Sequence, residues 1–459
     1  MRWIFAAVAV LMLTGCGNFE WFPDTETTPS TSAPVITSFS PTSGPAGTVV
    51  TIVGANFSTT SPNIVTFNGK TAITTAATST QLTAIVPTGA TTGKISVAAG
   101  SISNTVTSAT SFTVLTLMGG AVQGRPLTLS NIVSTIAGTA GNAGSSDGNG
   151  ISASFYFHKG ITTDGTNLYV ADTGNNTIRK IVIATGEVST LAGTVGIPGA
   201  LDDVGTAASF NLPFDVTTDG TNLYVADSGN NTIRKIVIAT GEVSTLAGEA
   251  EIPGFDDGVG AEARFDFPIG ITTDGLNLYV SDQTNYLIRK IVIATGEVTT
   301  LAGTLDTTCD VNDYDGIGTA AQFCLPTGIT TDGTNLYVAD AGYNTIRQIV
   351  IASGLVSTLA GRVGVPGSSD GSGAAQFNSP TGITTDGTNL YLSDTANNTI
   401  RKIVIASVAV STIAGTAGDS GSADGISATA RFDNPNGITT DGTNLYVVDS
   451  NNSTIRKIQ

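Results

Sequence analysis

A unit of about 55 residues recurs six times and constrains the fold more than any other feature of the sequence. The unit is marked by a T-D-G turn, whose aspartates are Asp164, Asp219, Asp274, Asp332, Asp386 and Asp441. Each unit holds four β-type runs between glycine-containing turns; in the first unit they are Gly160–Thr163, Asn167–Ala171, Thr177–Ala184 and Glu187–Leu191. Six repeats of this length, each a small four-stranded sheet, are typical of a β-propeller.

The two ends of the array indicate that the propeller is closed. The last unit stops at Gln459, inside its third run, and lacks a fourth. A single S-T-I-A-G run at 134–138 precedes the first unit without partners of its own. Residues 131–138 therefore supply the missing strand of the last blade, which removes open sheet edges. We expect a closed six-bladed propeller over residues 131–459.

The repeats resemble NHL repeats. The matching residues are Leu-Tyr-Val-Ala-Asp at Leu168–Asp172, the N-x-x-I-R-K-I run that ends at Ile181, and the stretch between units at Asp370–Pro380. The resemblance implies a six-bladed propeller and no single function, because that fold carries both binding proteins and enzymes.

Related propeller enzymes hold calcium through unlike acidic and amide side chains, or zinc through histidines, so their blades must differ. These blades are nearly identical, and we expect no odd Glu, His or Lys from an innermost strand. His158, the one histidine, stands where other units have proline, and we interpret it as a drifted loop position. The sequence therefore predicts no catalytic residue, no resident metal and no cofactor.

Residues 34–115 carry short β-type runs separated by Gly and Pro, a pattern that suggests a β-sandwich. The segment resembles an IPT/TIG immunoglobulin-like domain in the runs Pro34–Ile36, Phe39–Thr48, Asn56-Phe57, Val65–Gly69 and Val86-Pro87. The expected fold class is thus all-β, an Ig-like sandwich followed by the propeller, with a linker at 116–130.

The N-terminus reads as an export signal. Arg2 precedes a ten-residue apolar run that is too short to span a bilayer. The run leads into L-T-G-C, which resembles a bacterial lipobox, so residues 1–15 are the expected signal peptide and Cys16 the lipidation site. The alternative is an ordinary signal peptide. Residues 16–33 form a tether, and Gly17 favours an outer-membrane or cell-surface location.

The two other cysteines, Cys309 and Cys324, are expected to form a disulfide because an exported chain meets an oxidising compartment. Two free thiols are the alternative. The formal net charge of −17 and the pI of about 4.2 argue against nucleic acid as a partner.

The units also repeat the Asp of V-A-D and, seven residues later, the Arg of T-I-R. We interpret them as an ion pair within each blade or as Asp capping its own loop; a polar ring used for binding is the alternative.

The loops between blades vary and carry acid, so we expect the ligand to bind the face that they share with the D-x-x-N-N-T loops. The candidate residues, taken as solvated loop groups, are Asp256, Asp257, Asp313, Tyr314 and Asp315. A calcium site is a further candidate at Asp310, Asn312, Asp313 and Asp315, although the terminal Glu of a calcium loop is missing. The expected function is a lipid-anchored module that binds a protein, glycan or other ligand. The alternatives are a metal-dependent hydrolase or lyase and a structural envelope spacer.

Overall fold

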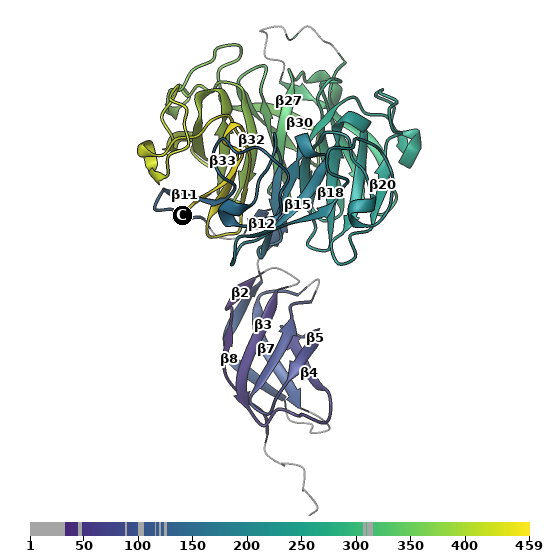
Figure 1. Ribbon diagram of the computed structural model, residues 1–459, viewed down its shortest axis with the longest axis vertical. Helices are drawn as coiled ribbons and strands as arrows, with labels where there is room; N and C mark the ends of the chain where they lie inside the picture. The colour runs from purple at the N-terminus through teal and green to yellow at the C-terminus, as the bar shows by residue number, and fades with distance from the viewer. Residues whose placement is uncertain are drawn as a thin grey trace, which may run out of the picture.

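The computed structural model describes residues 33–44, 48–87, 90–99, 105–114, 116–118, 121–123, 126–305, 309 and 315–459. Figure 1 shows a β-sandwich, in purple, followed by a six-bladed propeller coloured from blue to yellow. The predicted all-β fold is confirmed. The expected signal peptide, Cys16 and nearly all of the tether lie outside the described residues. No helix in the described part of the chain is long and apolar enough to cross a membrane.

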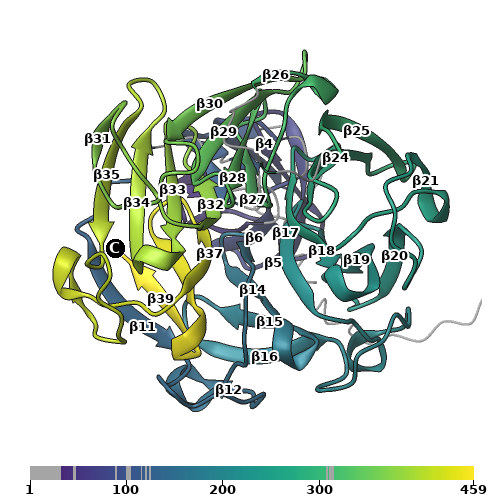
Figure 2. The same cartoon turned by 90° about the horizontal axis from the view of Figure 1, so that it is seen from above.

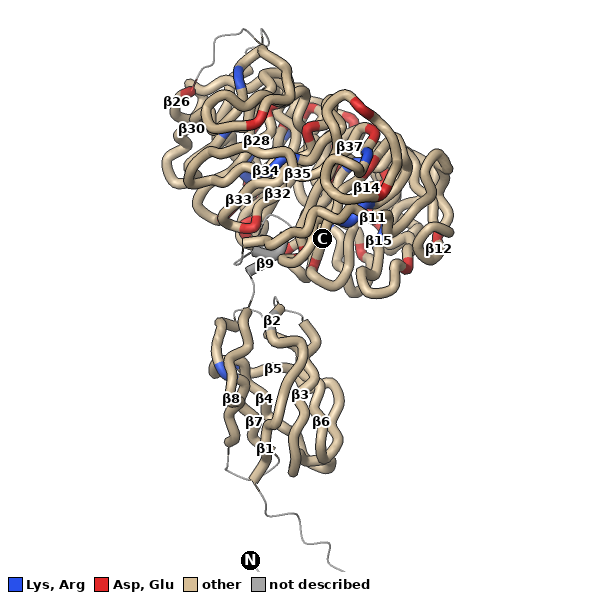
Figure 3. The backbone as a smooth tube through the Cα atoms, turned by 90° about the vertical axis from the view of Figure 1, so that its left-hand side faces the viewer, with Lys and Arg blue, Asp and Glu red and all other residues tan. Residues whose placement is uncertain are grey.

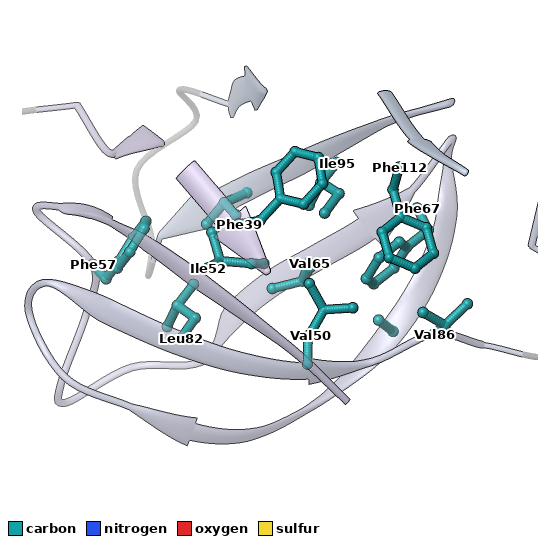
Figure 4. Packing of buried hydrophobic residues seen from close by; sticks show 13 residues of the cluster. Phe39, Val50, Ile52, Phe57, Val65, Phe67, Leu82, Val86, Ile95 and Phe112 are labelled. Atoms are coloured by element: carbon teal, nitrogen blue, oxygen red, sulfur yellow. The ribbon is translucent and has the colours of Figure 1, made fainter. Parts of the chain in front are cut away.

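The sandwich consists of eight strands around one apolar core. They are β1 (Val35–Ser40), β2 (Ser43–Gly44), β3 (Val49–Ala55), β4 (Asn63–Phe67), β5 (Lys70–Ala77), β6 (Gln81–Ile85), β7 (Gly93–Ala99) and β8 (Thr105–Val114), in the order β1-β3-β6-β5-β4-β7-β8-β2. Burial alternates along β4 and β6, as expected for strands with one face on a core. Figure 4 shows this core, in which Phe112 packs against both Phe39 and Phe67.

Each propeller blade contains four antiparallel strands that run outward from the channel. The innermost strands are β13 (Ile161–Thr163), β17 (Pro213–Thr218), β22 (Pro268–Thr273), β27 (Pro326–Thr331), β32 (Pro380–Thr385) and β37 (Pro435–Thr440). The second strands are β14 (Asn167–Asp172), β18 (Asn222–Asp227), β23 (Asn277–Asp282), β28 (Asn335–Asp340), β33 (Asn389–Asp394) and β38 (Leu445–Asp449). The third are β15 (Thr177–Val182), β19 (Thr232–Val237), β24 (Leu287–Val292), β29 (Thr345–Val350), β34 (Thr399–Val404) and β39 (Thr454–Ile458).

The outermost full-length strands are β16 (Glu187–Ala192), β20 (Val243–Ala247), β25 (Glu297–Gly303), β30 (Leu355–Gly361) and β35 (Ala409–Ala414) in blades 1 to 5. In blade 6 this place is taken by β11 (Ile132–Ala137), which pairs with β39 from Val133↔Ile458 to Ala137↔Ile455. The predicted closure of the ring by its first strand is therefore confirmed. Figure 2 views the closed ring from the side opposite the sandwich.

A short fifth strand, which the sequence did not predict, covers the outer edge of five blades. These strands are β12 (Gly148–Asn149), β21 (Gly258–Val259), β26 (Gly316–Ile317), β31 (Gly371–Ser372) and β36 (Gly425–Ile426). They come from the segments between blades, most of which continue in a three-residue 3-10 turn: η1 (Gly150–Ser152), η3 (Gly205–Ala207), η5 (Gly260–Glu262), η6 (Gly318–Ala320) and η8 (Ser427–Thr429). The same segments then insert an Ala and a Phe into the apolar core between adjacent blades, as Ala208 and Phe210 do between blades 1 and 2.

The segment expected to be a plain linker has structure of its own. It contains a hairpin of β9 (Thr116–Met118) and β10 (Ala121–Gln123), and β10 lies against β13, β32 and β37. Leu127 is buried in the core between blades 5 and 6, and its N–H donates to Asp386 Oδ2 at 3.0 Å. The chain is thus attached to the propeller before the first blade begins.

Candidate functional site

The repeated Asp and Arg form a buried ion pair in every blade. In blade 3, Arg289 Nη1 lies 2.8 Å from Asp282 Oδ2, and neither side chain is exposed. The guanidinium also stacks 5.1 Å from the centre of the Phe265 ring. The equivalent pairs are Asp172–Arg179, Asp227–Arg234, Asp340–Arg347, Asp394–Arg401 and Asp449–Arg456. The interpretation as an ion pair within the blade is confirmed, and complete burial excludes a polar ring open to ligands.

A second aspartate, from the segment between blades, binds the same arginine. Asp257 Oδ1 lies 2.9 Å from Arg289 Nη2 and accepts a hydrogen bond from the Thr300 hydroxyl at 3.0 Å. Asp315 binds Arg347 in the same way, at 2.8 Å. These two candidates are solvated as expected, being 48% and 46% exposed, but the ion pairs were not expected, and their part in ligand binding stays a prediction. Asp147, Asp202, Asp370 and Asp424 repeat the contact in the other blades.

The remaining loop candidates have varied outcomes. Asp256 is exposed, and its backbone carbonyl accepts from Arg289 Nη2 at 3.0 Å. Asp310, Asn312, Asp313 and Tyr314 lie outside the described residues, so the calcium candidate and this part of the binding face stay predictions. The predicted Cys309–Cys324 disulfide is confirmed. It ties that loop to the start of blade 4, where the Cys324 N–H donates to Asp340 Oδ1 at 2.8 Å.

A cavity of about 400 Å³ lies at one mouth of the central channel. Its lining comes from the first residues of the innermost strands, of which β17, β27 and β37 are labelled near the centre of Figure 2. Gln283 and Thr395, which directly follow β23 and β33, also line it. The cavity therefore opens on the face of the D-x-x-N-N-T loops. Deeper along the strands, the lining consists of Ile161, Ile329, Ile383 and Ile438.

A ring of glycines brings the innermost strands of adjacent blades close together. A Cβ atom placed on Gly270 would lie 2.1 Å from the Thr327 carbonyl oxygen, and one on Gly328 would lie 2.2 Å from that of Thr381. Only glycine fits such an approach. Gly160, Gly382 and Gly437 occupy the same position in three more blades.

Asp215 takes the place of this glycine in blade 2. Its Oδ1 accepts from the Val216 N–H at 2.8 Å, and its Oδ2 accepts from the Ile271 N–H of blade 3 at 3.1 Å. The carboxyl thus joins two blades by hydrogen bonds. Burial raises the pKa of Asp215 to about 7, although both hydrogen bonds favour the charged form.

The blades also differ at the two positions that flank the Pro or His at the start of the innermost strand, just before the glycine ring. From blade 1 to blade 6 the residues that follow the Pro or His are Lys159, Phe214, Ile269, Thr327, Thr381 and Asn436. Those that precede it are Phe157, Leu212, Phe267, Leu325, Ser379 and Asn434. Among those of these residues that line the cavity, Phe214, Phe267 and Ile269 form an apolar arc. The mouth also has a polar arc, defined as Thr327, Thr381, Asn434 and Asn436.

Lys159, in blade 1, lies between the two arcs, because blade 1 adjoins blade 2 on one side and blade 6 on the other. It is 7% exposed and lines the cavity. Its Nζ lies 4.2 Å from the centre of the Phe157 ring and 5.9 Å from that of Phe214. The described residues give this ammonium no hydrogen-bond acceptor and no ion-pair partner. Burial lowers the pKa of Lys159 to about 8.

The expectation of no odd Glu, His or Lys from an innermost strand did not consider the residues just before it, and Lys159 lies two residues before β13. His158 does lie in the loop before β13, as expected, but it is fully buried: its Nε2 lies 3.0 Å from the Thr454 carbonyl oxygen, and its ring stacks on Phe155. Burial lowers the pKa of His158 to about 4, so the ring is neutral and structural. Across the described parts of the chain, no three His, Cys, Asp or Glu side chains gather in a way that could hold a metal ion.

Comparison with known proteins agrees with both domains. Residues 34–114 match the IPT/TIG domain. Human NHL repeat-containing protein 2 is 28% identical over 324 residues, which cover 63% of this chain and 44% of that protein. The propeller repeats are thus similar to those of an NHL repeat-containing protein. The Arabidopsis thaliana protein SUPPRESSOR OF QUENCHING 1, chloroplastic, is 29% identical over 282 residues, or 58% of this chain and 26% of that protein. The chain thus spans less than half the length of these two relatives.

Solved structures share the two-domain architecture. An auxiliary nutrient binding protein from Bacteroides thetaiotaomicron superposes with a TM-score of 0.54 at 18% identity, over 94% of this chain and 98% of that one. A Bacteroides thetaiotaomicron protein of unknown function has a TM-score of 0.55 at 20% identity over the same shares. At these identities the likeness concerns the fold alone.

Proposed function

We propose that this chain is an exported, lipid-anchored protein that binds a small organic ligand at the channel mouth of its NHL-type propeller. One observation carries the proposal: the blades are nearly identical in their strands and turns, yet they differ at the position after the Pro or His, where all six residues line one cavity. A structural ring needs no such difference, whereas a ligand-binding pocket needs unlike groups on its different sides. The Bacteroides thetaiotaomicron protein that shares this fold is named as an auxiliary nutrient binding protein, which supports a ligand-binding function.

The size and chemistry of the cavity suit a small ligand. A volume of about 400 Å³ lies in the range of small-molecule sites, which combine apolar walls with a few fixed polar groups. Phe214 and Phe267 supply aromatic surface, with ring centres 6.4 Å apart in an edge-to-face arrangement. Asn434 and Asn436 supply amide groups on the opposite side, where Asn436 Nδ2 donates to Asn434 Oδ1 at 2.8 Å.

The sandwich serves as a spacer between anchor and propeller. It carries two lysines, Lys70 and Lys94, and no acidic residue between positions 34 and 114, whereas Figure 3 shows acidic residues spread over the propeller. The lipobox-like L-T-G-C motif makes Cys16 the proposed anchor. Replacing Cys16 with Ser should release the protein into the soluble fraction. Unchanged membrane association, with no lipid mass on the mature N-terminus, would contradict lipidation.

Ligand binding can be tested with N-phenyl-1-naphthylamine, a neutral aromatic probe whose fluorescence rises in apolar sites. We expect saturable binding that is strongly weakened by Asn434→Phe. This change fills the polar side of the mouth, and its backbone position already holds Phe157 and Phe267 in blades 1 and 3. Leu276→Phe is the matched control, because it adds bulk to an exposed turn on the opposite face.

Equal binding by wild type and Asn434→Phe would place the probe elsewhere and reject the channel mouth. Native mass spectrometry of protein taken from its own cells adds a second measurement. A retained small molecule, lost in the Asn434→Phe variant, is the expected result. If every partner found binds only the sandwich, the propeller is a structural spacer instead.

A further inference from the structure

We infer that Lys159 is the anion receptor of the channel-mouth cavity, and that the ligand is an amphipathic organic anion with a carboxylate, phosphate or sulfonate on an apolar body. This inference rests on the proposed function, since it names the class of ligand for the same cavity.

The first observation is the isolation of the Lys159 ammonium. Charged groups that leave water are normally paired, because an uncompensated charge in a protein interior is costly. Lys159 is more than nine-tenths buried, yet the described residues supply only aromatic faces to its Nζ. A cation–π contact compensates part of the lost hydration. The described residues offer the N–H donors of the ammonium no acceptor, so these donors face the cavity that Lys159 lines. An anionic ligand in the cavity would provide one.

The second observation is the state of the carboxyl that lines the same cavity. Both oxygens of Asp215 are occupied by backbone N–H groups, from Val216 and Ile271, and no ion pair with Lys159 is formed. Because its pKa is raised to about 7, this carboxyl is largely neutral below that pH. His158, next to Lys159, is neutral as well, since its pKa is lowered to about 4. The ammonium is then the dominant charge at the mouth.

The third observation concerns the rest of the ligand. On one side Lys159 adjoins blade 6 of the polar arc, where the Gly437 N–H donates to the Lys159 carbonyl oxygen at 2.9 Å. On its other side the lining is apolar, with Phe214 in the next blade and then Phe267 and Ile269 in the one after. These apolar residues would receive a hydrocarbon or aromatic body attached to the anionic group. The polar arc on the other side would accept or donate hydrogen bonds to further substituents. A free inorganic anion would leave both arcs unused, so the ligand has an apolar body as well as a charge.

The overall charge of the molecule makes the assignment specific. With a net charge of −17, the protein repels anions over most of its surface. Anion binding therefore requires a local positive site. If Lys159 is that site, removal of this one lysine should abolish anion binding.

The test uses two probes that share one skeleton. 8-Anilinonaphthalene-1-sulfonate is an anion, and N-phenyl-1-naphthylamine is its neutral counterpart without the sulfonate. We expect Lys159→Met to lower the affinity for the anionic probe by about tenfold or more, which is the usual effect of losing a charge-assisted hydrogen bond. The neutral probe should change by less than about twofold, and Lys159→Arg should retain anion binding because it keeps the charge.

Lys402→Met is the matched control, since the Lys402 Nζ also lies over an aromatic ring, that of Tyr391 at 6.0 Å, away from the cavity. If Lys159→Met weakens both probes equally, the lysine acts through packing and the inference is overturned. It is also overturned if the neutral probe binds at the mouth and the anion is unaffected. Failure of both probes to bind the wild type would instead reject the proposed function. Lys159→Gln replaces the Met variant if that protein loses its tyrosine near-ultraviolet signal.

Discussion

The buried ion pairs make a quantitative prediction about stability, which is clearest in blade 3. Replacing Arg289 with Met keeps most of the aliphatic stem against Phe265 and removes the guanidinium. Asp282 is then left fully buried with hydrogen bonds from Asn285 Nδ2 and the Asp266 N–H, at 2.9 and 2.8 Å, and with no cation. Breaking a buried pair from one side leaves an uncompensated charge, which typically costs about 3–5 kcal/mol of unfolding free energy.

The matched control is Asp257→Asn, which changes the other partner of the same arginine. The Asp257 side chain is 48% exposed, and asparagine can still accept from both Arg289 and Thr300. Half-exposed pairs contribute roughly 0–1 kcal/mol, so this variant should remain close to the wild type. Arg289→Met removes the buried ion pair together with the other contacts of the guanidinium, whereas Asp257→Asn removes only the charge of its half-exposed partner.

The difference should also depend on pH. Burial raises the pKa of Asp282 to about 6 in the wild type, although Arg289 opposes the shift. Without the guanidinium the pKa of the carboxyl rises further. Because the folded variant then holds its proton to a higher pH than the unfolded chain does, its stability falls as the pH rises. The deficit of Arg289→Met should thus be smaller at pH 5 than at pH 8.

Urea unfolding followed by tyrosine near-ultraviolet circular dichroism is a suitable assay. All ten tyrosines lie between positions 156 and 446, and both tryptophans lie at positions 3 and 21, so the tyrosine signal reports the propeller alone. The argument would be refuted if Arg289→Met lost no more than about 1 kcal/mol of unfolding free energy beyond the loss in Asp257→Asn. Burial would then not decide how much each ion pair of Arg289 contributes to stability.

Three further predictions follow from the ring and its mouth. Binding of the anionic probe should weaken between about pH 6 and 9, because Asp215 gains its charge near pH 7 and Lys159 loses its own near pH 8; a flat titration would contradict these roles. Deleting residues 131–138 should unfold or aggregate the propeller, whereas deleting eight tether residues at 24–31 should leave its melting temperature unchanged. Cys309→Ser combined with Cys324→Ser should remove at most roughly 3 kcal/mol on the chain-entropy model and leave the other blades' tyrosine signal native; a global loss of that signal would show that the disulfide holds the ring.

Much of this fold could be predicted because its rules are local and repeated. The T-D-G turns, the β-type runs and the unpaired first strand identified blade number, strand order and closure from the sequence alone. The fifth strand was missed because β21 contains only Gly258 and Val259, too few residues for any pattern. Its position depends on the edge of a strand from the next repeat, which the sequence does not display.

The second aspartate that binds each repeated arginine was missed for a different reason. Asp257 and Asp315 looked like loop charges because they lie in segments of variable length. Their partners Arg289 and Arg347 both follow 32 positions later. That spacing was visible in the sequence, but it indicates a contact only once the segment is known to fold back over the outer strand of its own blade.

The channel mouth was missed because the repeats were compared from the I-T-T-D-G motif onward, where they scarcely differ. A comparison that begins a few residues earlier, at the Pro with which most innermost strands start, shows the difference. The residue after this Pro, or after His158 in blade 1, is Lys, Phe, Ile, Thr, Thr and Asn in blades 1 to 6. In a ring of similar blades, equivalent positions on the innermost strands face the central channel. Differences among these residues therefore change the surface that a ligand in the channel would contact. Elsewhere the same packing limits substitution in the repeated blades: the close approach at glycine in five of them, and the Asp–Arg pair and the inserted Phe in all six. The mouth is free of these constraints, and there the chain can place a cation and aromatic rings on one side and amides on the other. A symmetric scaffold thereby gains a pocket that can orient an asymmetric ligand.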